Sequence, residues 1–264
     1  MQHTDFSFEV LEQLLARYRP ISLLEMDSAT LLNRVEKKFV MHLSKIESVL
    51  TLAFQDYRVL EIDNTRLLEY STEYYDTKDN AMYLAHHNGK QNRFKVRKRE
   101  YLISGEQFLE VKRRLHNGRI QKKRVELDGE KYNENSSQLF IENATPYKMD
   151  GLEKKLVNAF HRITLVSELK NERITIDLGL RFNNPDTSID LPAIAIIEVK
   201  QEKAGSQAGF ELILRNLGIH SFSVSKYCIG RALLEPTLKA SLFQNKLRYI
   251  TKLNAIVYNY NSRF

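Results

Sequence analysis

Polar and apolar residues alternate with a period of two through much of this chain, and the alternation predicts β-strands. Between Arg93 and Arg99 the sequence reads R-F-K-V-R-K-R, with a basic residue at every second position. Side chains on a strand alternate faces, so the four cations point to one side and Phe94 and Val96 point to the other. Four like charges on one strand face repel one another unless an anion or carboxylates lie among them.

Further strands follow from the same alternation or from runs of β-forming residues. They are predicted at 33–41, 69–77, 107–115, 119–127, 173–182 and 194–202. Asn88-Gly89 precedes the basic strand and Asn117-Gly118 separates two other alternating runs. Asn-Gly between such runs is a strong hairpin signal, so we expect antiparallel pairing. The count is about eight strands.

Apolar residues spaced three or four apart predict helices. These are 8–18, 46–54, 152–160, 210–217 and the end of the chain from Ser225 onward. Ser44 and Glu47 have the spacing of a capping box, and Gly218 has the position of a C-terminal cap. The polar stretch 129–143 is interpreted as a linker or insert. His86 and His87 lie by an expected turn, which predicts solvated side chains.

These elements predict an α+β fold, with an eight-stranded antiparallel β-barrel flanked by helices. The charged strand faces could point outward or inward. The helices have strong apolar faces that need an aliphatic surface to cover, which favours the inward arrangement. We therefore expect residues 1–264 to form one domain, with a charged tunnel through its barrel.

Composition narrows the partners of such a tunnel. The chain of 264 residues carries 40 Lys and Arg against 33 Asp and Glu, a net charge of +7, which suggests an anionic partner. The one cysteine, Cys228, excludes an internal disulfide and suits a reducing compartment. No apolar run has the length of a membrane helix, and the N-terminus lacks the pattern of a signal peptide. We therefore expect a cytoplasmic protein.

A solvated sheet face is the simpler interpretation of alternating charges on any one strand. It becomes improbable when six strands carry the same cationic face, because a sheet of that size would leave one whole face unpaired. Several cations on a shared inner face could hold a polyanion without any recognition of bases. A phosphate oxygen about 4 Å from one of them gains roughly 4 kcal/mol at an effective dielectric of 20, before desolvation.

Eight short motifs occur in an order that resembles a known family. They are R-x-E-x-K at 34–38, Y-Y-D-T at 74–77, K-V-R-K-R-E-Y at 95–101, F-L-E-V-K at 108–112, K-x-R at 122–124, E-R-I-T-I-D at 172–177, I-I-E-V-K at 196–200 and S-K-Y-C-x-G at 225–230. The set resembles the catalytic domain of the vacuolar transporter chaperone (VTC) polyphosphate polymerases, part of the triphosphate-tunnel (CYTH-like) superfamily. The resemblance covers about residues 30–235.

The resemblance implies a site and a reaction. In that family a tunnel moves the γ-phosphate of ATP onto a growing polyphosphate chain with a divalent metal. Lys226, Arg97 and Arg99 would then act at the reacting phosphates, and Glu198 would hold Mn or Mg. By motif, the remaining phosphate-binding positions would be Lys38, Lys122, Arg162 and Arg173, and the shared strand parity adds Lys112, Arg124 and Lys200. The expected partners are ATP and polyphosphate, with no nucleic acid and no membrane segment in this chain.

Two alternatives stay open. The first is a tunnel triphosphatase, whose relatives carry more paired acids; here Arg34 and Ile196 occupy two of those positions, which favours a phosphate chain over water as acceptor. The second is a non-catalytic polyanion or RNA binder, although the neighbours of the basic residues read as core and not as a stacking platform. For Glu198 the simpler interpretation is an ion pair with Lys200 or with a neighbouring arginine.

Overall fold

The computed structural model describes residues 8–28, 34–127, 134–202 and 209–256. The helices are α1 (Phe8–Ala16), α2 (Leu23–Ser28), α3 (Ile46–Ala53), α4 (Ala81–His87), α5 (Glu134–Ala144), α6 (Phe210–Asn216), α7 (Lys226–Leu234) and α8 (Gln244–Asn254). The strands are β1 (Pro20–Ile21), β2 (Arg34–His42), β3 (Arg58–Leu60), β4 (Leu68–Thr77), β5 (Arg93–Tyr101), β6 (Gln107–Arg114), β7 (Ile120–Glu126), β8 (Leu152–Ser167), β9 (Glu172–Asn183), β10 (Ser188–Leu191) and β11 (Ile194–Glu202).

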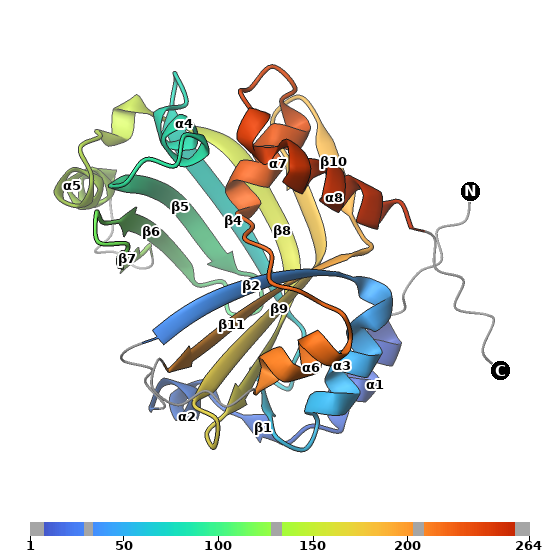
Figure 1. The fold of residues 1–264 in the computed structure, drawn as a ribbon. Coiled ribbons are helices and arrows are strands. Elements are labelled where there is room, and N and C mark those ends of the chain that lie inside the picture. The colour runs from blue at the N-terminus through green and yellow to red at the C-terminus, as the bar shows by residue number, and fades with distance from the viewer. Residues whose placement is uncertain (1–7, 29–33, 128–133, 203–208, 257–264) are drawn as a thin grey trace.

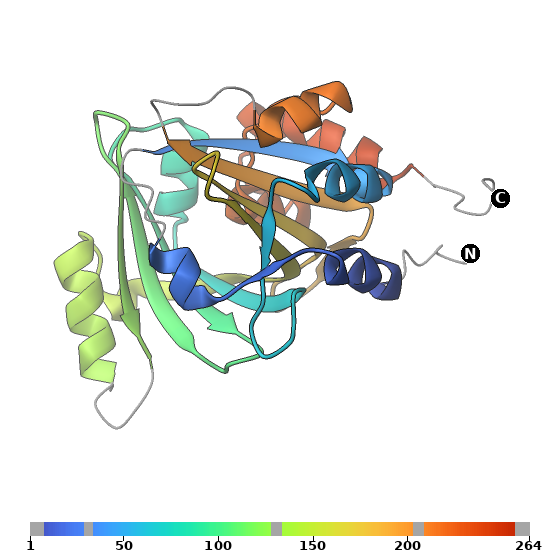
Figure 2. The same ribbon diagram turned by 90° about the horizontal axis from the view of Figure 1, so that it is seen from below.

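Eight of these strands form one curled antiparallel sheet, in the order β2-β11-β9-β8-β4-β5-β6-β7 (Figures 1 and 2). The short β10 pairs with β9, while β3 pairs with β8 and carries β1 as a parallel neighbour. The predicted α+β fold is confirmed: eight antiparallel strands curl into a half-barrel, and helices flank it. Within the described residues β2 and β7 are the two edges of the sheet, and no ladder joins them.

Apolar side chains on the outer face explain why helices flank the sheet. One core lies between β2, β11, β9 and β8 and the helices α1, α3 and α6, with Phe39, Ile176 and Ile197 against Leu50 and Phe210. A second covers β5 and β6 with α4 and α5, where Val96 and Val111 meet Met82 and Ile141. Burying these faces outward leaves the alternate residues of the same strands on the inner face.

The inner face is apolar where α7 and α8 pack on it. Leu156 and Phe182 from β8 and β9 meet Tyr227 of α7 and Ile250 of α8. The approach of α7 is close, because a Cβ on Gly230 would lie 2.5 Å from the Phe182 ring. The charged part of the inner face therefore ends where α7 begins, at its N-terminal end (Figure 1).

A β-bulge lets β9 contribute to both cores. The alternation over 173–182 predicts one continuous apolar face, but Leu178 packs in the outer core and Leu180 in the inner one. Between them Gly179 has φ of +61°, and the register against β8 shifts by one residue there. Glycine reaches this backbone region without strain, and one extra residue moves every later side chain to the opposite face.

Two predicted segments are wrong. Residues 152–160 form the start of β8, not a helix, because apolar residues four apart fit a strand as well as a helix. The stretch 129–143 contains α5, whose Ile141 is fully buried; residues 128–133 lie outside the described part. The apolar face of α5 is narrow, and the polar composition of the stretch therefore gave no sign of a helix.

Three local signals also have a different role. Asn88-Gly89 follows α4 and ends it, whereas Asn117-Gly118 does form the β6–β7 hairpin. The α3 helix begins at Ile46 without a side-chain cap, and Ser44 instead bonds to His42. His87 is buried at 2% exposure, so the solvated interpretation fails for it. No helix among the described residues has the length and apolarity needed to cross a membrane.

Candidate functional site

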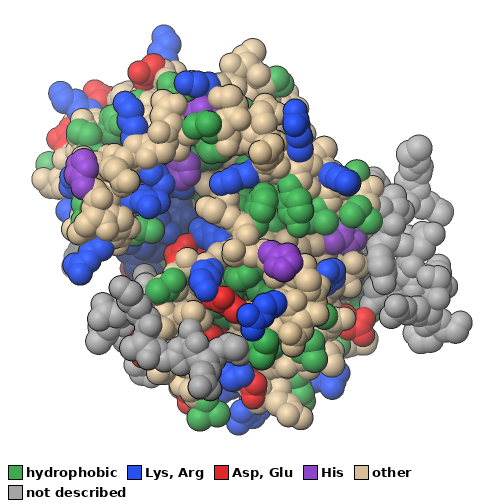
Figure 3. All heavy atoms as spheres, viewed as in Figure 1, with side chains coloured by type: hydrophobic (Ala, Val, Ile, Leu, Met, Phe, Trp, Pro, Cys, Tyr) green, Lys and Arg blue, Asp and Glu red, His purple; other side chains and the backbone are tan. Residues whose placement is uncertain are grey.

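Strand register places the basic residues of β5, β6 and β7 in rows across the inner face. Lys95 pairs with Lys112, and Lys112 pairs with Lys122. One row deeper, Arg97 pairs with Glu110 and Glu110 with Arg124. Directly opposed residues point to the same side of a sheet, so the sequence alternation becomes a cationic wall. Figure 3 shows Lys and Arg side chains lining a recess on this part of the molecule.

Glu110 braces this wall from within. It is 1% exposed, and its carboxylate lies 2.5 Å from a guanidinium nitrogen of Arg97 and also pairs with Lys122. Burial opposes its charge, but the cations Arg97, Arg99 and Lys122 outweigh burial and hold the pKa of Glu110 well below its usual value. Its negative charge keeps two phosphate-binding candidates in place.

Asp177 has the same role on β8, β9 and α7. Arg162 donates to both of its oxygens, at 2.6 and 2.8 Å, and Lys226 at the first turn of α7 also pairs with it. Burial raises the pKa of Asp177, but the two cations lower it to about 2. Burial also lowers the pKa of Lys226, to about 8. Lys226 is therefore held in the site by its ion pair with Asp177, and it is not a surface lysine.

The third wall comes from β2 and β11. Glu198 lies 2.7 Å from Lys200 and 3.3 Å from Lys38, which in turn lies 3.0 Å from Glu36. Burial opposes the charge of Glu198, but Lys200 and Lys38 hold its pKa well below the usual value. The ion pair with Lys200, the simpler alternative to a metal-binding role for Glu198, is present. Its presence does not exclude a metal, because both lysine side chains keep some exposure, 30% for Lys38 and 22% for Lys200, and a cation could displace them.

The carboxylates of this wall could bind a hard divalent cation only if phosphate oxygens of the substrate complete its coordination. Mg²⁺ and similar ions are usually bound by one or two carboxylates plus phosphate oxygens. Glu198 and Glu36 share Lys38 between them and could provide those carboxylates. Among the described residues no cluster of three or more acidic, histidine or cysteine ligands exists. A metal there would depend on phosphate oxygens for the rest of its coordination.

Arg99 and Lys112 are among the inner-face cations that form no ion pair with a carboxylate of the described residues. Arg99 is 8% exposed, its Nε has no hydrogen-bond partner, and its guanidinium lies 5.7 Å from the centre of the Tyr70 ring. Burial and the neighbouring Arg97 and Arg162 lower its pKa. Arg97 and burial place the pKa of Lys112 well below its usual value. These groups repel one another until an anion joins them.

The walls act on one another electrostatically, so they face a common space. Glu198 and Glu36, from β11 and β2 at the opposite end of the strand order, raise the pKa of Lys112, and Arg162 of β8 lowers that of Arg99. Of the predicted residues, the structure brings together Lys38, Arg97, Arg99, Lys112, Lys122, Arg162, Lys200, Lys226 and Glu198.

The remaining two predicted residues lie on the same face with other contacts. Arg124 covers the Phe108 ring at 4.9 Å. Arg173 pairs in register with Lys200 and donates to the Met26 carbonyl of α2 at 2.7 Å. Both residues lie on the predicted face of their strands. Each contacts an uncharged group, the Phe108 ring for Arg124 and the Met26 carbonyl for Arg173.

Two residues beside the site were not among the predicted site residues, although Lys95 was predicted to lie on the inner face. Lys95 donates to Ser225, the N-cap of α7, at 2.8 Å, and burial lowers its pKa to about 8. His86 sits on α4, where burial and nearby cations lower its pKa to about 2. The parity of β5 already pointed to Lys95. No local signal pointed to His86, because its neighbours come from distant parts of the chain.

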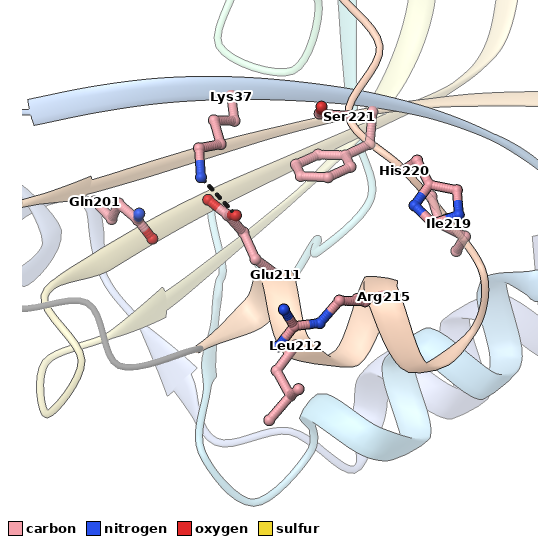
Figure 4. A pocket seen from close by; sticks show the side chains of 9 residues that line it. Lys37, Gln201, Glu211, Leu212, Arg215, Ile219, His220 and Ser221 are labelled. Carbon is pink, nitrogen blue, oxygen red and sulfur yellow. Dashed lines mark hydrogen bonds and ion pairs between the residues drawn. The ribbon is translucent and has the colours of Figure 1, made fainter.

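A second hollow lies on the opposite side of β2, with a volume of about 430 Å³. Lys37 and Glu211 point toward each other across it and form an ion pair at 2.7 Å (Figure 4). Lys37 is adjacent to Lys38 in sequence, so its side chain leaves the other face of the strand. This hollow is separate from the cationic site, and Arg215 and His220 also line it.

Three comparisons place the chain among known proteins. The sequence model of the VTC domain family matches residues 33–235. None of the curated proteins matches the chain. Solved structures with a similar fold include a candidate adenylate cyclase from Vibrio parahaemolyticus, with 15% identity and a TM-score of 0.44 over 74% of this chain and 95% of that one.

Two further similar structures come from other organisms. A candidate adenylate cyclase from Bacillus halodurans has 14% identity and a TM-score of 0.45, over 74% of this chain and 96% of that one. HpAC1 from Hippeastrum, a candidate adenylyl cyclase described as having dominant triphosphatase activity, has 14% identity and a TM-score of 0.45, over 75% of this chain and 95% of that one.

Proposed function

Because this chain belongs to the VTC domain family, we propose that it is a polyphosphate polymerase that transfers the γ-phosphate of ATP onto a growing polyphosphate chain. The observation that carries the proposal is the surplus of cations on the inner face. Glu36, Glu110, Asp177 and Glu198 neutralise part of it, while Arg99 and Lys112 are left with no carboxylate partner among the described residues. A polyanion supplies the missing charge.

Phosphoryl transfer needs position and charge neutralisation more than it needs a protein nucleophile. A terminal oxygen of the chain would attack the γ-phosphorus, and the bond to the bridging oxygen of ADP would break. Arg97 and Arg99 suit the transferring group, because guanidinium binds phosphate through two parallel hydrogen bonds. Lys226, already held near Arg162 by Asp177, would supply a point charge at the same place.

The other cations would hold the phosphates on either side of the reacting centre. Lys38, Lys112, Lys122 and Lys200 line the near walls, with Arg124, Arg162 and Arg173 on the neighbouring strands. Mn or Mg held by Glu198 and by substrate oxygens would neutralise charge on the phosphates. We also propose that residues 1–264 act as one domain with cytoplasmic ATP as substrate.

A triphosphatase is the second candidate, and the Glu36–Lys38–Glu198 arrangement is what favours it, since paired acids can hold a metal that activates water. Ile196, which is 7% exposed on the same strand as Glu198, offers no further carboxylate there. That lack favours a phosphate chain over water as the acceptor.

Incubation with ATP and Mn or Mg tests the proposal directly. We expect ADP and polyphosphate visible on a stained gel, with little free phosphate. Stoichiometric free phosphate without polymer would establish the triphosphatase. No turnover with either metal, combined with tight tripolyphosphate binding, would establish a binding module.

A further inference from the structure

The hollow on the outer side of β2 has the size of a site for a small molecule. Side chains from β2, β11, α6 and residues 219–221 line it (Figure 4). Its volume of about 430 Å³ lies within the range of about 300–1,000 Å³ that ligand pockets occupy. The segment after α6 is fixed against β2, because Ser221 bridges to Phe39 and the Phe222 amide donates to the Lys38 carbonyl at 2.6 Å. Backbone pairing therefore holds this wall of the hollow in place.

Two charged side chains that line the hollow have unused binding capacity. Glu211 accepts a hydrogen bond from Lys37 through Oε2, at 2.7 Å, but its Oε1 is buried and has no hydrogen-bond partner. A buried acceptor without a partner is costly to the fold. Arg215 forms no ion pair and no side-chain hydrogen bond with any residue that the structure describes.

These two residues do not neutralise each other, although they are well placed to do so. Glu211 and Arg215 are one turn apart on α6, in the order that favours an ion pair on a helix. The carboxylate is instead directed at Lys37, as Figure 4 shows. The last torsion of a glutamate side chain is broad, so a ligand can turn Oε1 into the hollow. A carboxylate and a guanidinium are therefore within reach of one small molecule.

Apolar side chains form another part of the lining. Leu212 of α6 is 37% exposed, and Phe39 and Ile219 line the hollow with little exposure of their own. A ligand that matches this lining has three parts. They are a cationic hydrogen-bond donor for the carboxylate, an anionic group for the guanidinium and an aliphatic group for these apolar side chains.

We propose that this hollow binds a small zwitterion of the α-amino-acid class with an aliphatic side chain. Its ammonium group donates to Glu211, its carboxylate accepts two parallel hydrogen bonds from Arg215, and its side chain covers Leu212. Phosphates match the hollow less well, because the Glu211 carboxylate repels them. The proposal does not depend on the proposed function, since the hollow and the cationic site lie on opposite faces of β2.

Calorimetric titration with L-leucine tests the assignment, with two truncated ligands for comparison. Isopentylamine is leucine without its carboxylate, and isocaproate is leucine without its ammonium group. We expect L-leucine to bind, and each truncated ligand to bind about tenfold more weakly or worse, because each has lost one charge-assisted contact.

Two single variants test the same contacts from the side of the protein. Glu211→Gln and Arg215→Gln should each lower L-leucine affinity about tenfold. Both should leave tripolyphosphate affinity within about twofold of the unaltered protein, because neither residue belongs to the cationic site. The matched control is Arg248→Gln, which removes a charge from an exposed position of α8 and should change neither affinity. Melting temperatures establish that each variant is folded, and the exposed position of Arg215 makes its variant the safer of the two.

No binding of L-leucine at about 10 mM would overturn the proposal, as would binding that neither variant weakens. Isocaproate binding as tight as that of L-leucine would show a simple anion site and would also overturn it. Inorganic phosphate that displaces L-leucine, with a loss in Arg215→Gln alone, would lead to the same conclusion. Failure to make polymer from ATP would refute the proposed function alone, since the zwitterion site is measured by binding.

Discussion

Neighbouring arginines on β5 have opposite roles in stability. Arg97 pairs with the buried Glu110, while Arg99 has no acid partner and only the Tyr70 ring beside it. We predict that Arg97→Ala lowers the free energy of unfolding by about 2 kcal/mol, because it leaves Glu110 with Lys122 as its remaining ion-pair partner. Arg99→Ala should leave stability unchanged or raise it. Both should weaken tripolyphosphate binding, and urea unfolding with calorimetry measures the two effects separately.

The acid at Glu198 is separable from the cations around it. Glu198→Gln keeps the size of the side chain and an oxygen that can accept from Lys200, but removes the charge that a divalent metal needs. We predict that this variant binds polyphosphate as tightly as the unaltered protein or more tightly, yet makes no polymer from ATP. Retained synthesis with Mn would move the metal to Glu36.

The lysines near α7 make binding depend on pH. Burial lowers the pKa of both Lys95 and Lys226 to about 8, so each is cationic below pH 8 and neutral above it. A bound anion favours the charged form, and therefore tripolyphosphate affinity must fall as pH rises. Loss of the Lys226 charge should lower tripolyphosphate affinity about tenfold between pH 7 and pH 9. Lys226→Arg should remove part of that slope, and an unchanged slope would exclude Lys226 as its source.

At the scale of elements, α7 depends on one small residue. In an open helix position Gly→Ala would add about 1 kcal/mol of stability. At Gly230 the new Cβ would meet Phe182 at 2.5 Å and Leu156 at 2.9 Å, and overpacking costs about 1–3 kcal/mol. We predict a net loss of stability for Gly230→Ala, larger loss of polymer synthesis because Lys226 begins the same helix, and partial rescue by Phe182→Leu. Gly151→Ala, which meets nothing within 4 Å, is the matched control.

Much of the sheet could be predicted because its signal is local. The period of two defines β5, β6, β7, β9 and β11 and the parity of most site residues. The long strand β8 escaped because spacing of four residues satisfies both a helix and a strand. The partners of the cations escaped too: Glu110 and Asp177 were on the expected face, but their role depends on register between strands. The surroundings of His86 could not be predicted either, because they come from the contact of α4 with the segment before α8, which lies far away in the sequence.

At the scale of the whole molecule, the cation surplus should make stability depend on anions. A ligand that binds the folded state alone stabilises it by about 2.7 kcal/mol at a hundredfold excess over its dissociation constant. We predict that tripolyphosphate raises the melting temperature and that added salt weakens the effect through screening. Monovalent anions at the same ionic strength are the control, and an equal shift with them would indicate simple screening of the excess charge.

The position of β2 at one edge of the sheet bears on how the chain folds. In the described sheet its ladder partner is β11, and the whole chain from Leu43 to Ala193 lies between them. Pairing that spans so much sequence is slow to form, because loop closure precedes any gain from contacts. Until β11 is synthesised, the apolar side chains of Phe39, Val40 and Met41 have no strand to join. Newly made chains are therefore most exposed to aggregation at this strand, and refolding yield should fall steeply with protein concentration.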